Sequence, residues 1–159
     1  MNEIRFTIYQ EPTGKATVHH TRSGITYQTK EQKYTENALM TEMLPFRPPE
    51  PITDPIQVHL RLYFPVPQSK SAWWKAAALA GYIHYDKKPD DDNCRKQLAD
   101  ALEKLQFIKN DSQIYYGITF KAYSAKPRWE VLIVVNENIT REKWLKLKKE
   151  HLEIMENFK

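Results

Sequence analysis

Five prolines crowd the segment 45–55 of this chain, at positions 45, 48, 49, 51 and 55. Proline has no backbone N–H to donate and its ring clashes with the preceding helical turn, so no regular helix continues through such a segment. We therefore expect an irregular connector here, which separates whatever secondary structure precedes it from whatever follows.

The segments on either side of this connector carry two different periodicities. Residues 29–44 begin with a possible helix cap at Thr29 and place apolar side chains at roughly helical spacing, which predicts a helix. These side chains are Tyr34, Ala38, Met40 and Leu44. Residues 56–66 alternate strictly, with Val58, Leu60 and Leu62 on one side, which is the period of a half-buried strand.

The rest of the chain alternates between similar signals. The expected elements are a strand at 4–9, a hairpin across 16–29 around Ser23-Gly24, helices at 69–81 and 91–105, strands at 113–123 and 128–136, and an amphipathic helix at 140–158. This order predicts an α+β fold: a single small domain whose mixed or antiparallel sheet has helices packed on one face. We place this domain at residues 1–138, with 139–159 as a C-terminal helix appended to it.

Composition excludes several classes of site. The chain has 24 Lys and Arg against 20 Asp and Glu, a net charge of +4 that suits a polyanionic partner without demanding one. Cys94 is the single cysteine, so neither an intrachain disulfide nor a Cys-rich zinc site is expected. With only four glycines we expect no Gly-rich phosphate loop, and no apolar run is long enough to span a membrane. The N-terminus does not read as a signal peptide, so we expect a cytoplasmic protein.

Three adjacent aspartates, Asp90, Asp91 and Asp92, stand at the start of the helix expected from residue 91. Carboxylates about 4 Å apart repel by about 4 kcal/mol at an effective dielectric constant of 20, so water or a cation must compensate for them. Residues two apart share a side only in an extended segment, which Pro89 favours for the residue before it. We therefore expect Asp90 and Asp92 to converge, with Lys96 one helical turn after Asp92.

A further aspartate, Asp111, lies in the turn between this helix and the next expected strand. If the chain returns alongside the helix, Asp90, Asp92 and Asp111 form a set of oxygen ligands suited to Mg²⁺. Such an ion acts as a Lewis acid and as a source of hydroxide for attack on phosphorus. The alternative is that acidic residues at a helix start only cap it and meet its dipole. A calcium EF-hand is excluded, because Arg95 and Ala101 occupy the positions that require Gly and Glu.

Two segments together resemble a known family. KKPDDDNCRKQLADAL at 87–102, followed by FIKNDSQI at 107–114, closely resembles the motif of the RusA family of Holliday-junction endodeoxyribonucleases. That motif runs Lys-Pro-Asp-x-Asp-Asn, a lysine in the first helical turn, Asp-Ala-Leu, and Asp-Asp-Ser/Ala-Gln before a strand. The matching residues here are Asp90, Asp92, Asn93, Lys96, Asp111 and Gln113. The likeness covers most of residues 5–135.

The resemblance implies a homodimer that binds a four-way DNA junction and nicks two strands symmetrically, with no membrane involved. It implies Mg²⁺ as the cofactor, with Mn²⁺ as a substitute, held by Asp90, Asp92 and Asp111, and it adds Lys96 to the catalytic set. We expect DNA contacts from a group of basic residues: Lys15, Arg22, Lys30, Lys87, Lys88 and Lys121. Two positions depart from the motif: Asn110 replaces its first downstream aspartate, and Asp91 replaces a common leucine.

Two other functions remain open at this point. The chain could bind branched DNA without cutting it, through a degenerate metal site, or its aspartates could hold a metal that only stabilises the fold. The complete set of Asp90, Asp92, Lys96 and Asp111 favours the nuclease. Of the neighbouring Trp73 and Trp74, we expect one to pack in the fold and the other to lie on the surface.

Overall fold

The computed structural model describes residues 3–15, 19–20, 23, 26–27 and 29–157. Every helix and strand expected from the sequence is present, within a few residues at each end. In chain order the elements are β1 (Glu3–Ile8), β2 (His19–His20), β3 (Thr26–Tyr27), α1 (Lys30–Met43), the 3-10 helix η1 (Leu44–Phe46), β4 (Ile56–Pro65), α2 (Ala72–Leu79), α3 (Asp91–Lys104), the 3-10 helix η2 (Asp111–Gln113), β5 (Ile114–Ser124), β6 (Arg128–Val135) and α4 (Arg141–Asn157).

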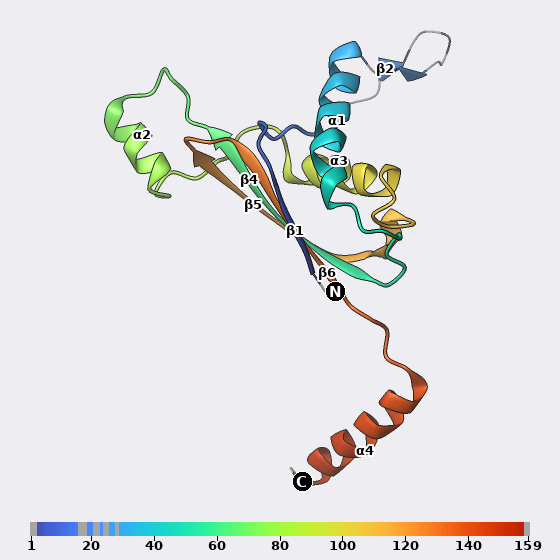
Figure 1. Cartoon of the computed structure of the whole chain (residues 1–159). Helices are drawn as coiled ribbons and strands as arrows, with labels where there is room; N and C mark the ends of the chain where they lie inside the picture. The colour runs from blue at the N-terminus through green and yellow to red at the C-terminus, as the bar shows by residue number, and fades with distance from the viewer. Residues whose placement is uncertain (1–2, 16–18, 21–22, 24–25, 28, 158–159) are drawn as a thin grey trace.

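Four strands form one mixed sheet in the order β1-β6-β4-β5. The pairs β1–β6 and β4–β6 are antiparallel, whereas β4 and β5 are parallel. Parallel neighbours require a crossover connection, and here the crossover carries α2 and α3. Figure 1 shows α1 and α3 on the same side of the sheet, whereas α4 stands clear of the sheet and of the other helices. The predicted α+β class is therefore confirmed.

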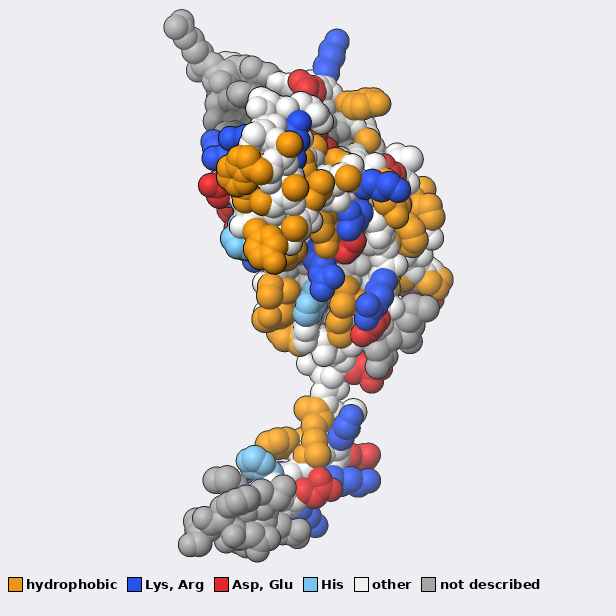
Figure 2. Space-filling model, turned by 90° about the vertical axis from the view of Figure 1, so that its left-hand side faces the viewer, with side chains coloured by type: hydrophobic (Ala, Val, Ile, Leu, Met, Phe, Trp, Pro, Cys, Tyr) orange, Lys and Arg blue, Asp and Glu red, His pale blue; other side chains and the backbone are white. Residues whose placement is uncertain are grey.

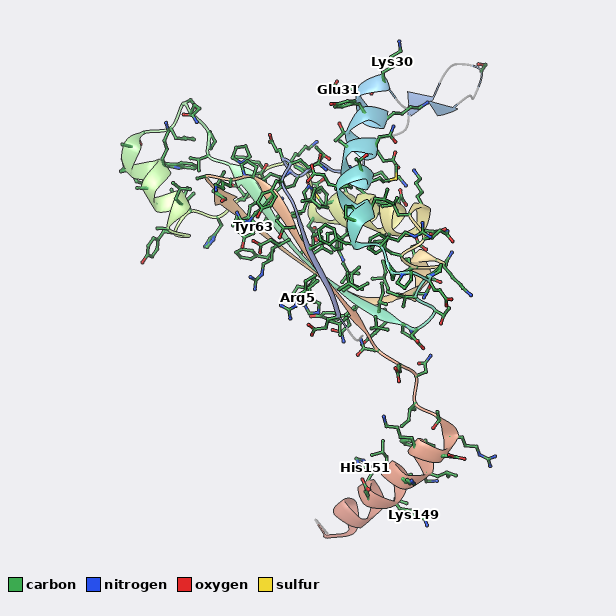
Figure 3. All side chains as sticks on the ribbon, in the orientation of Figure 1. Arg5, Lys30, Glu31, Tyr63, Lys149 and His151 are labelled. Atoms are coloured by element: carbon green, nitrogen blue, oxygen red, sulfur yellow. The ribbon has the colours of Figure 1, made fainter. Side chains whose placement is uncertain are left out.

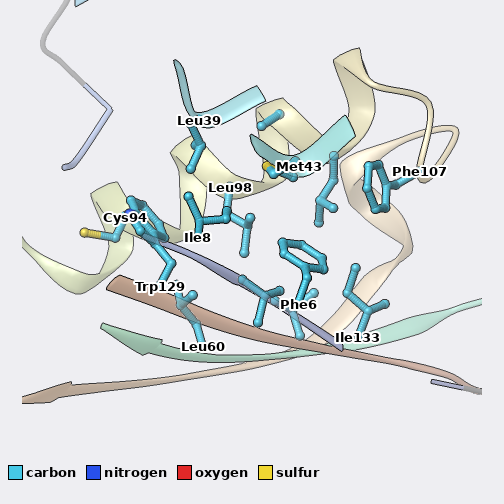
Figure 4. Close-up of a cluster of buried hydrophobic side chains, with 14 of the residues drawn as sticks. Phe6, Ile8, Leu39, Met43, Leu60, Cys94, Leu98, Phe107, Trp129 and Ile133 are labelled. Atoms are coloured by element: carbon cyan, nitrogen blue, oxygen red, sulfur yellow. The ribbon is translucent and has the colours of Figure 1, made fainter. Parts of the chain in front are cut away.

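The hydrophobic core fills the space between the sheet and the pair α1 and α3 (Figure 4). Its fully buried members include Ile8, Leu39, Leu98, Phe107 and Trp129. The alternation predicted for β4 is confirmed, since the side chains at 58, 60 and 62 are all buried. In α1 the side chains of Leu39 and Met43, four residues apart, are buried, and Met40 packs against the core. Tyr34 and Leu44 are exposed.

Local chemistry explains where the helices begin and end. The Thr29 hydroxyl accepts from the Gln32 amide at 3.2 Å, and the Gln32 side chain accepts from the Thr29 amide at 2.9 Å. This reciprocal capping box starts α1. Helix α2 begins after Ser71, and Gly81, with φ of +83°, follows its end. Glycine adopts this left-handed conformation without the steric cost that a Cβ imposes.

The connectors are also as expected where the structure describes them. In the N-terminal hairpin His19 pairs with Tyr27 and His20 with Thr26, while Gly24 of the predicted turn lies outside the described residues. The proline-rich connector after η1 is irregular and makes one isolated parallel bridge, from Ile52 to Ile108. Among the helices that the structure describes, none combines the length and hydrophobicity that crossing a bilayer requires.

In the part of the chain that the structure describes, no helix covers the sheet face opposite α1 and α3 (Figure 1). Arg5 and Tyr63 point away from the sheet on this side (Figure 3), where a groove of about 790 Å³ also receives Ile118 and Phe120. Phe120 is 53% exposed. Viewed from the side that carries α2, hydrophobic side chains lie among Lys, Arg and His side chains (Figure 2). This surface therefore combines apolar side chains with charged ones, among them Arg5, Arg61 and Glu130 of the groove.

Candidate active site

The acidic segment changes conformation at Asp90. This residue is the N-cap of α3, with extended backbone angles φ of −69° and ψ of 149°, and helical geometry begins at Asp91. Its carbonyl accepts from the Cys94 amide at 3.2 Å, whereas its carboxylate makes no capping hydrogen bond. The Asp90 side chain is exposed and its oxygens are therefore open to another partner.

Helix α3 begins at Asp91 as expected, and this start bears on a second prediction. We predicted that Asp90 and Asp92 converge because the chain is still extended between them. Asp90 has extended backbone angles, whereas Asp92 already lies in the first turn of the helix that begins at Asp91. Asp90 lies before the first helical residue, so helical spacing does not fix its direction relative to Asp92, and their convergence stays a prediction.

The other two aspartates each face a cation one helical turn later. Asp91 contacts the Arg95 guanidinium at 3.1 Å, and Asp92 lies 3.7 Å from the Lys96 ammonium. The prediction that Asp92 and Lys96 share a helical face is thus confirmed. All four side chains are substantially exposed, so water screens both pairs and each contributes little to stability.

Asp111 is held by the 3-10 helix η2. The Asn110 side chain caps this helix by accepting from the Ser112 amide at 2.9 Å. The Asp111 amide donates to the Glu103 carboxylate of α3 at 3.2 Å, which ties the turn to that helix. Asn and Asp are equally good caps, so the Asn110 that departs from the family motif has a structural role here.

Gln113 fixes the same turn through four hydrogen bonds. Its carbonyl oxygen accepts from the amides of Lys109 at 2.8 Å and Asn110 at 3.0 Å. Its amide nitrogen donates to the carbonyls of Ile52 at 2.9 Å and Asp54 at 3.1 Å. The motif glutamine therefore joins the Asp111 turn to the proline-rich connector.

Three predicted catalytic residues meet at one open cavity of about 430 Å³. Asp92 and Lys96 reach it from α3, and Asp111 reaches it from η2. Sequence reasoning missed two further polar members, Arg95 and Tyr115. The spacing of four residues between Asp91 and Arg95 could have identified Arg95. Tyr115 could not be identified from the sequence, because the crossover that brings β5 to α3 is a tertiary feature. Asp90 is not among the residues that line this cavity, although it borders α3 directly.

The structure does not gather the three carboxylates into a finished metal site. Across residues 3–15, 19–20, 23, 26–27 and 29–157, no group of three or more His, Cys, Asp or Glu side chains is placed to hold a metal ion. The donors that line the cavity are nevertheless of the right chemistry, because Mg²⁺ takes few protein carboxylates and keeps several waters. Asp92 and Asp111 in an open, water-accessible cavity fit that requirement.

Cys94 is not a candidate ligand. Its side chain is fully buried in the core, and this burial raises the pKa of its thiol to about 12. A thiol must lose its proton to bind a metal, and at neutral pH this one keeps it. The chemistry of the cavity therefore depends on oxygen donors.

The basic residues expected to contact DNA occupy different environments. Lys15 forms an ion pair with Asp100, and Lys87 lies 3.3 Å from the Asp86 carboxylate. The Lys121 ammonium donates to the backbone carbonyls of Lys87 and Pro89. Lys30, at the start of α1, is exposed and is labelled in Figure 3. Lys88, just before Pro89, is also exposed. Arg22 lies outside the described residues.

The adjacent tryptophans separate as predicted into one packed and one exposed side chain. Trp74 packs edge-on against Tyr123 with ring centres 5.3 Å apart, and the Lys70 ammonium lies 5.1 Å from its ring. Trp73 is 70% exposed. Helix α2 is thus anchored to β5 through Trp74 and presents Trp73 to solvent.

Comparison with known proteins assigns this arrangement to a family. Residues 10–134 match the family model described as Endodeoxyribonuclease RusA. Over 138 residues the chain is also 33% identical to a Bacillus subtilis (strain 168) protein that carries the name Uncharacterized protein YqaN, and this match covers 84% of the chain and 96% of that protein. The matched range contains α3, η2 and every residue of the cavity. The chain therefore belongs to the RusA family of endodeoxyribonucleases.

Proposed function

We propose that this protein is a Mg²⁺-dependent endonuclease that resolves four-way DNA junctions by paired symmetric nicks during recombination and repair. The observation that carries the proposal is the cavity in which Asp92, Lys96 and Asp111 meet. Two oxygen donors and a cation around one open space match what phosphodiester hydrolysis requires: a place for a metal, a place for the phosphate, and access for water.

In this proposal Asp92 and Asp111 hold the ion, and Asp90 completes the ligand set from the adjoining N-cap. When bound, Mg²⁺ supplies Lewis-acid polarisation of the phosphate and favours deprotonation of water. Asp90 is included as a ligand because its carboxylate makes no capping hydrogen bond and because it directly precedes the helical turn that carries Asp92.

The cavity's cations have the complementary task. Lys96 and Arg95 line it together and place positive charge where the phosphate must sit, so they stabilise the negative charge that builds up during hydrolysis. The planar Arg95 guanidinium is held by Asp91 at 3.1 Å, which limits its orientations before DNA arrives. Lys96 keeps a looser contact with Asp92 and can leave it for the phosphate.

A homodimer suits this function, because a two-fold enzyme matches the two-fold symmetry of a four-way junction. The uncovered sheet face, with Ile118 and Phe120 exposed, supports a second copy, since it leaves apolar surface in water. Phosphate contacts by exposed lysines such as Lys30 and Lys88 would make junction binding salt-dependent.

The test uses purified protein, Mg²⁺, a synthetic four-way junction and a linear duplex of matched sequence, with Asp92→Asn alongside. We expect nicks in the junction only, lost in Asp92→Asn and lost when EDTA removes the metal, while junction binding persists. Equal cleavage of the linear duplex would contradict junction selectivity. Junction binding without nicks under any divalent cation would support a non-cleaving branched-DNA-binding protein instead.

A further inference from the structure

Lys121 of β5 reaches across to the segment that precedes the acidic site. Its ammonium donates to the carbonyl of Lys87 at 2.8 Å and to the carbonyl of Pro89 at 2.9 Å. It also lies 4.9 Å from the centre of the Tyr85 ring and 5.9 Å from the centre of the Phe64 ring. Two of its three donors are thus used by backbone oxygens, and aromatic faces flank the charge.

Tyr85 binds the Lys88 carbonyl, which lies in the chain between the two carbonyls that Lys121 binds. Its hydroxyl donates to the Lys88 carbonyl at 2.5 Å. Its ring stacks on Phe64 with centres 3.8 Å apart and contacts Tyr123 at 5.1 Å, so it is fixed to both β4 and β5. Burial raises the pKa of Tyr85 to about 12, so the hydroxyl keeps its proton and remains a donor. Three consecutive carbonyls before Asp90 are therefore held by two side chains.

The N-terminal loop closes on the same segment from another direction. The Lys15 amide donates to the Asn93 carbonyl at 3.0 Å. A Cβ placed on Gly14 would lie 2.9 Å from Pro89 Cβ and 3.0 Å from Asn93 Cβ, so the backbone passes in direct contact with both. Residues 87–93 are thus constrained by side chains of the sheet and by the 14–15 backbone.

We propose that Lys121, assisted by Tyr85, is a positioning residue that sets the carboxylates at the start of α3 for metal binding. The proposal rests on the function proposed above, and it gives Lys121 a different task from the phosphate contact expected from sequence. Its hydrogen bonds fix where the extended segment ends and where α3 begins, and that boundary decides the directions of Asp90 and Asp92. Partners that orient metal ligands in this way typically change metal affinity about 10- to 100-fold when removed.

The main variant is Lys121→Met, which keeps a long apolar stem against the Tyr85 and Phe64 rings but removes the charge and the donors. Lys121→Arg restores both. Tyr85→Phe removes only the hydroxyl that binds the Lys88 carbonyl. The matched control is Lys126→Met, which deletes one exposed lysine from the turn after β5. Thermal unfolding of each variant checks that the fold is intact.

The first measurement is Mn²⁺ binding in the absence of DNA, detected through the electron paramagnetic resonance signal of the free ion. We expect affinity to fall about tenfold or more in Lys121→Met, less in Tyr85→Phe, and not at all in Lys126→Met, with recovery in Lys121→Arg. The second is the Mg²⁺ concentration that gives half-maximal cleavage, which should rise in Lys121→Met while cleavage at saturating Mg²⁺ recovers towards the wild-type rate.

The third measurement is junction affinity in EDTA over a range of salt concentrations. A positioning role leaves the salt slope of Lys121→Met unchanged, whereas loss of a phosphate contact lowers it by about one. Unchanged Mn²⁺ binding together with a lower slope would overturn the proposal, as would a wild-type protein that binds no Mn²⁺. A wild-type protein that binds Mn²⁺ but does not nick the junction would refute the proposed function alone, because the Mn²⁺ comparison among variants still decides the role of Lys121.

Discussion

Asp91 forms an ion pair with Arg95, and Asp92 lines the cavity with Asp111. Asp90 is the N-cap residue of α3, and its carboxylate makes no capping hydrogen bond. These neighbours in the sequence thus have three different surroundings. The repulsion expected within the run is relieved by two cations on the same helix, Arg95 and Lys96, in addition to solvent. A run of like charges at a helix start therefore contains residues that are not interchangeable.

Asp91→Leu tests this distinction directly. Because the Asp91–Arg95 pair is exposed, its loss should change the free energy of unfolding by less than about 1 kcal/mol, and junction nicking should remain largely intact. Asp92→Asn, measured in parallel, should abolish nicking. If Asp91→Leu loses nicking while its thermal unfolding stays normal, the assignment of these residues is wrong.

Gly14→Ala tests the close approach of the N-terminal loop to the acidic segment. The added Cβ would meet Pro89 and Asn93 at 2.9 and 3.0 Å, and relieving this contact should cost about 1–3 kcal/mol of unfolding free energy. Gly117→Ala is the control, because its nearest neighbour, the Arg95 guanidinium, would lie at 3.6 Å, an ordinary contact. Urea denaturation measures both variants, and equal stability of the two would refute the steric argument.

At the scale of elements, periodicity and punctuation in the sequence were sufficient to predict the helices and strands. Strict alternation predicted β4, and the Ser and Gly near the ends of α2 predicted its approximate bounds. The parallel pairing of β4 with β5 could not be predicted, because it depends on how the crossover packs rather than on either strand's own pattern. The start of α3 at Asp91 was predicted correctly, because Asp is a preferred helix cap and an apolar stripe follows it.

The Gln113 turn was also beyond sequence reasoning. The motif match identified Gln113, but its four hydrogen-bond partners lie in two separate segments, 52–54 and 109–110, that only the fold brings together. The same tertiary packing places Asp111 at the cavity of Asp92 and Lys96. The residue types of the site could therefore be predicted from the sequence. Their contacts could not, because these depend on how the crossover between β4 and β5 packs.

Gln113→Leu should destabilise the protein and impair its activity together. Removing both ends of the amide leaves up to four backbone groups without their partner, so we expect a loss of about 2–4 kcal/mol in the free energy of unfolding. Nicking should fall as well, because the Asp111 turn is released from the connector. Ser112→Ala, an exposed neighbour, should leave both quantities near wild type. Normal stability in Gln113→Leu would show that these hydrogen bonds are replaced by water without cost.

At the scale of the whole molecule, the family match, the core and the cavity coincide in one unit. The match ends at residue 134, and the buried core, as far as the structure describes it, contains no residue of α4. Helix α4 stands clear of this unit and exposes Trp144, Leu145 and Leu152. The assignment of 139–159 to the same domain and the cytoplasmic location expected from the sequence stay predictions.

Truncation after Asn138 should therefore preserve the fold. We expect the shortened protein to unfold cooperatively within a few degrees of the full chain's Tm, because the core it keeps is complete. Differential scanning calorimetry of both proteins provides the comparison. A truncated protein that unfolds well below the full chain would show that α4 contributes to the stability of the domain.

We propose that the site of Asp92 and Asp111 makes paired nicks in a four-way junction. Mapping the nicks on two strands of one junction tests this proposal most directly. Two opposite strands carry different end labels, and the products of a single reaction with Mg²⁺ are sized on a denaturing gel. We predict nicks at symmetric positions on both strands, produced by the wild type and absent from Asp92→Asn and Asp111→Asn. Unpaired nicks at scattered positions, or paired nicks that persist in both variants, would contradict the claim.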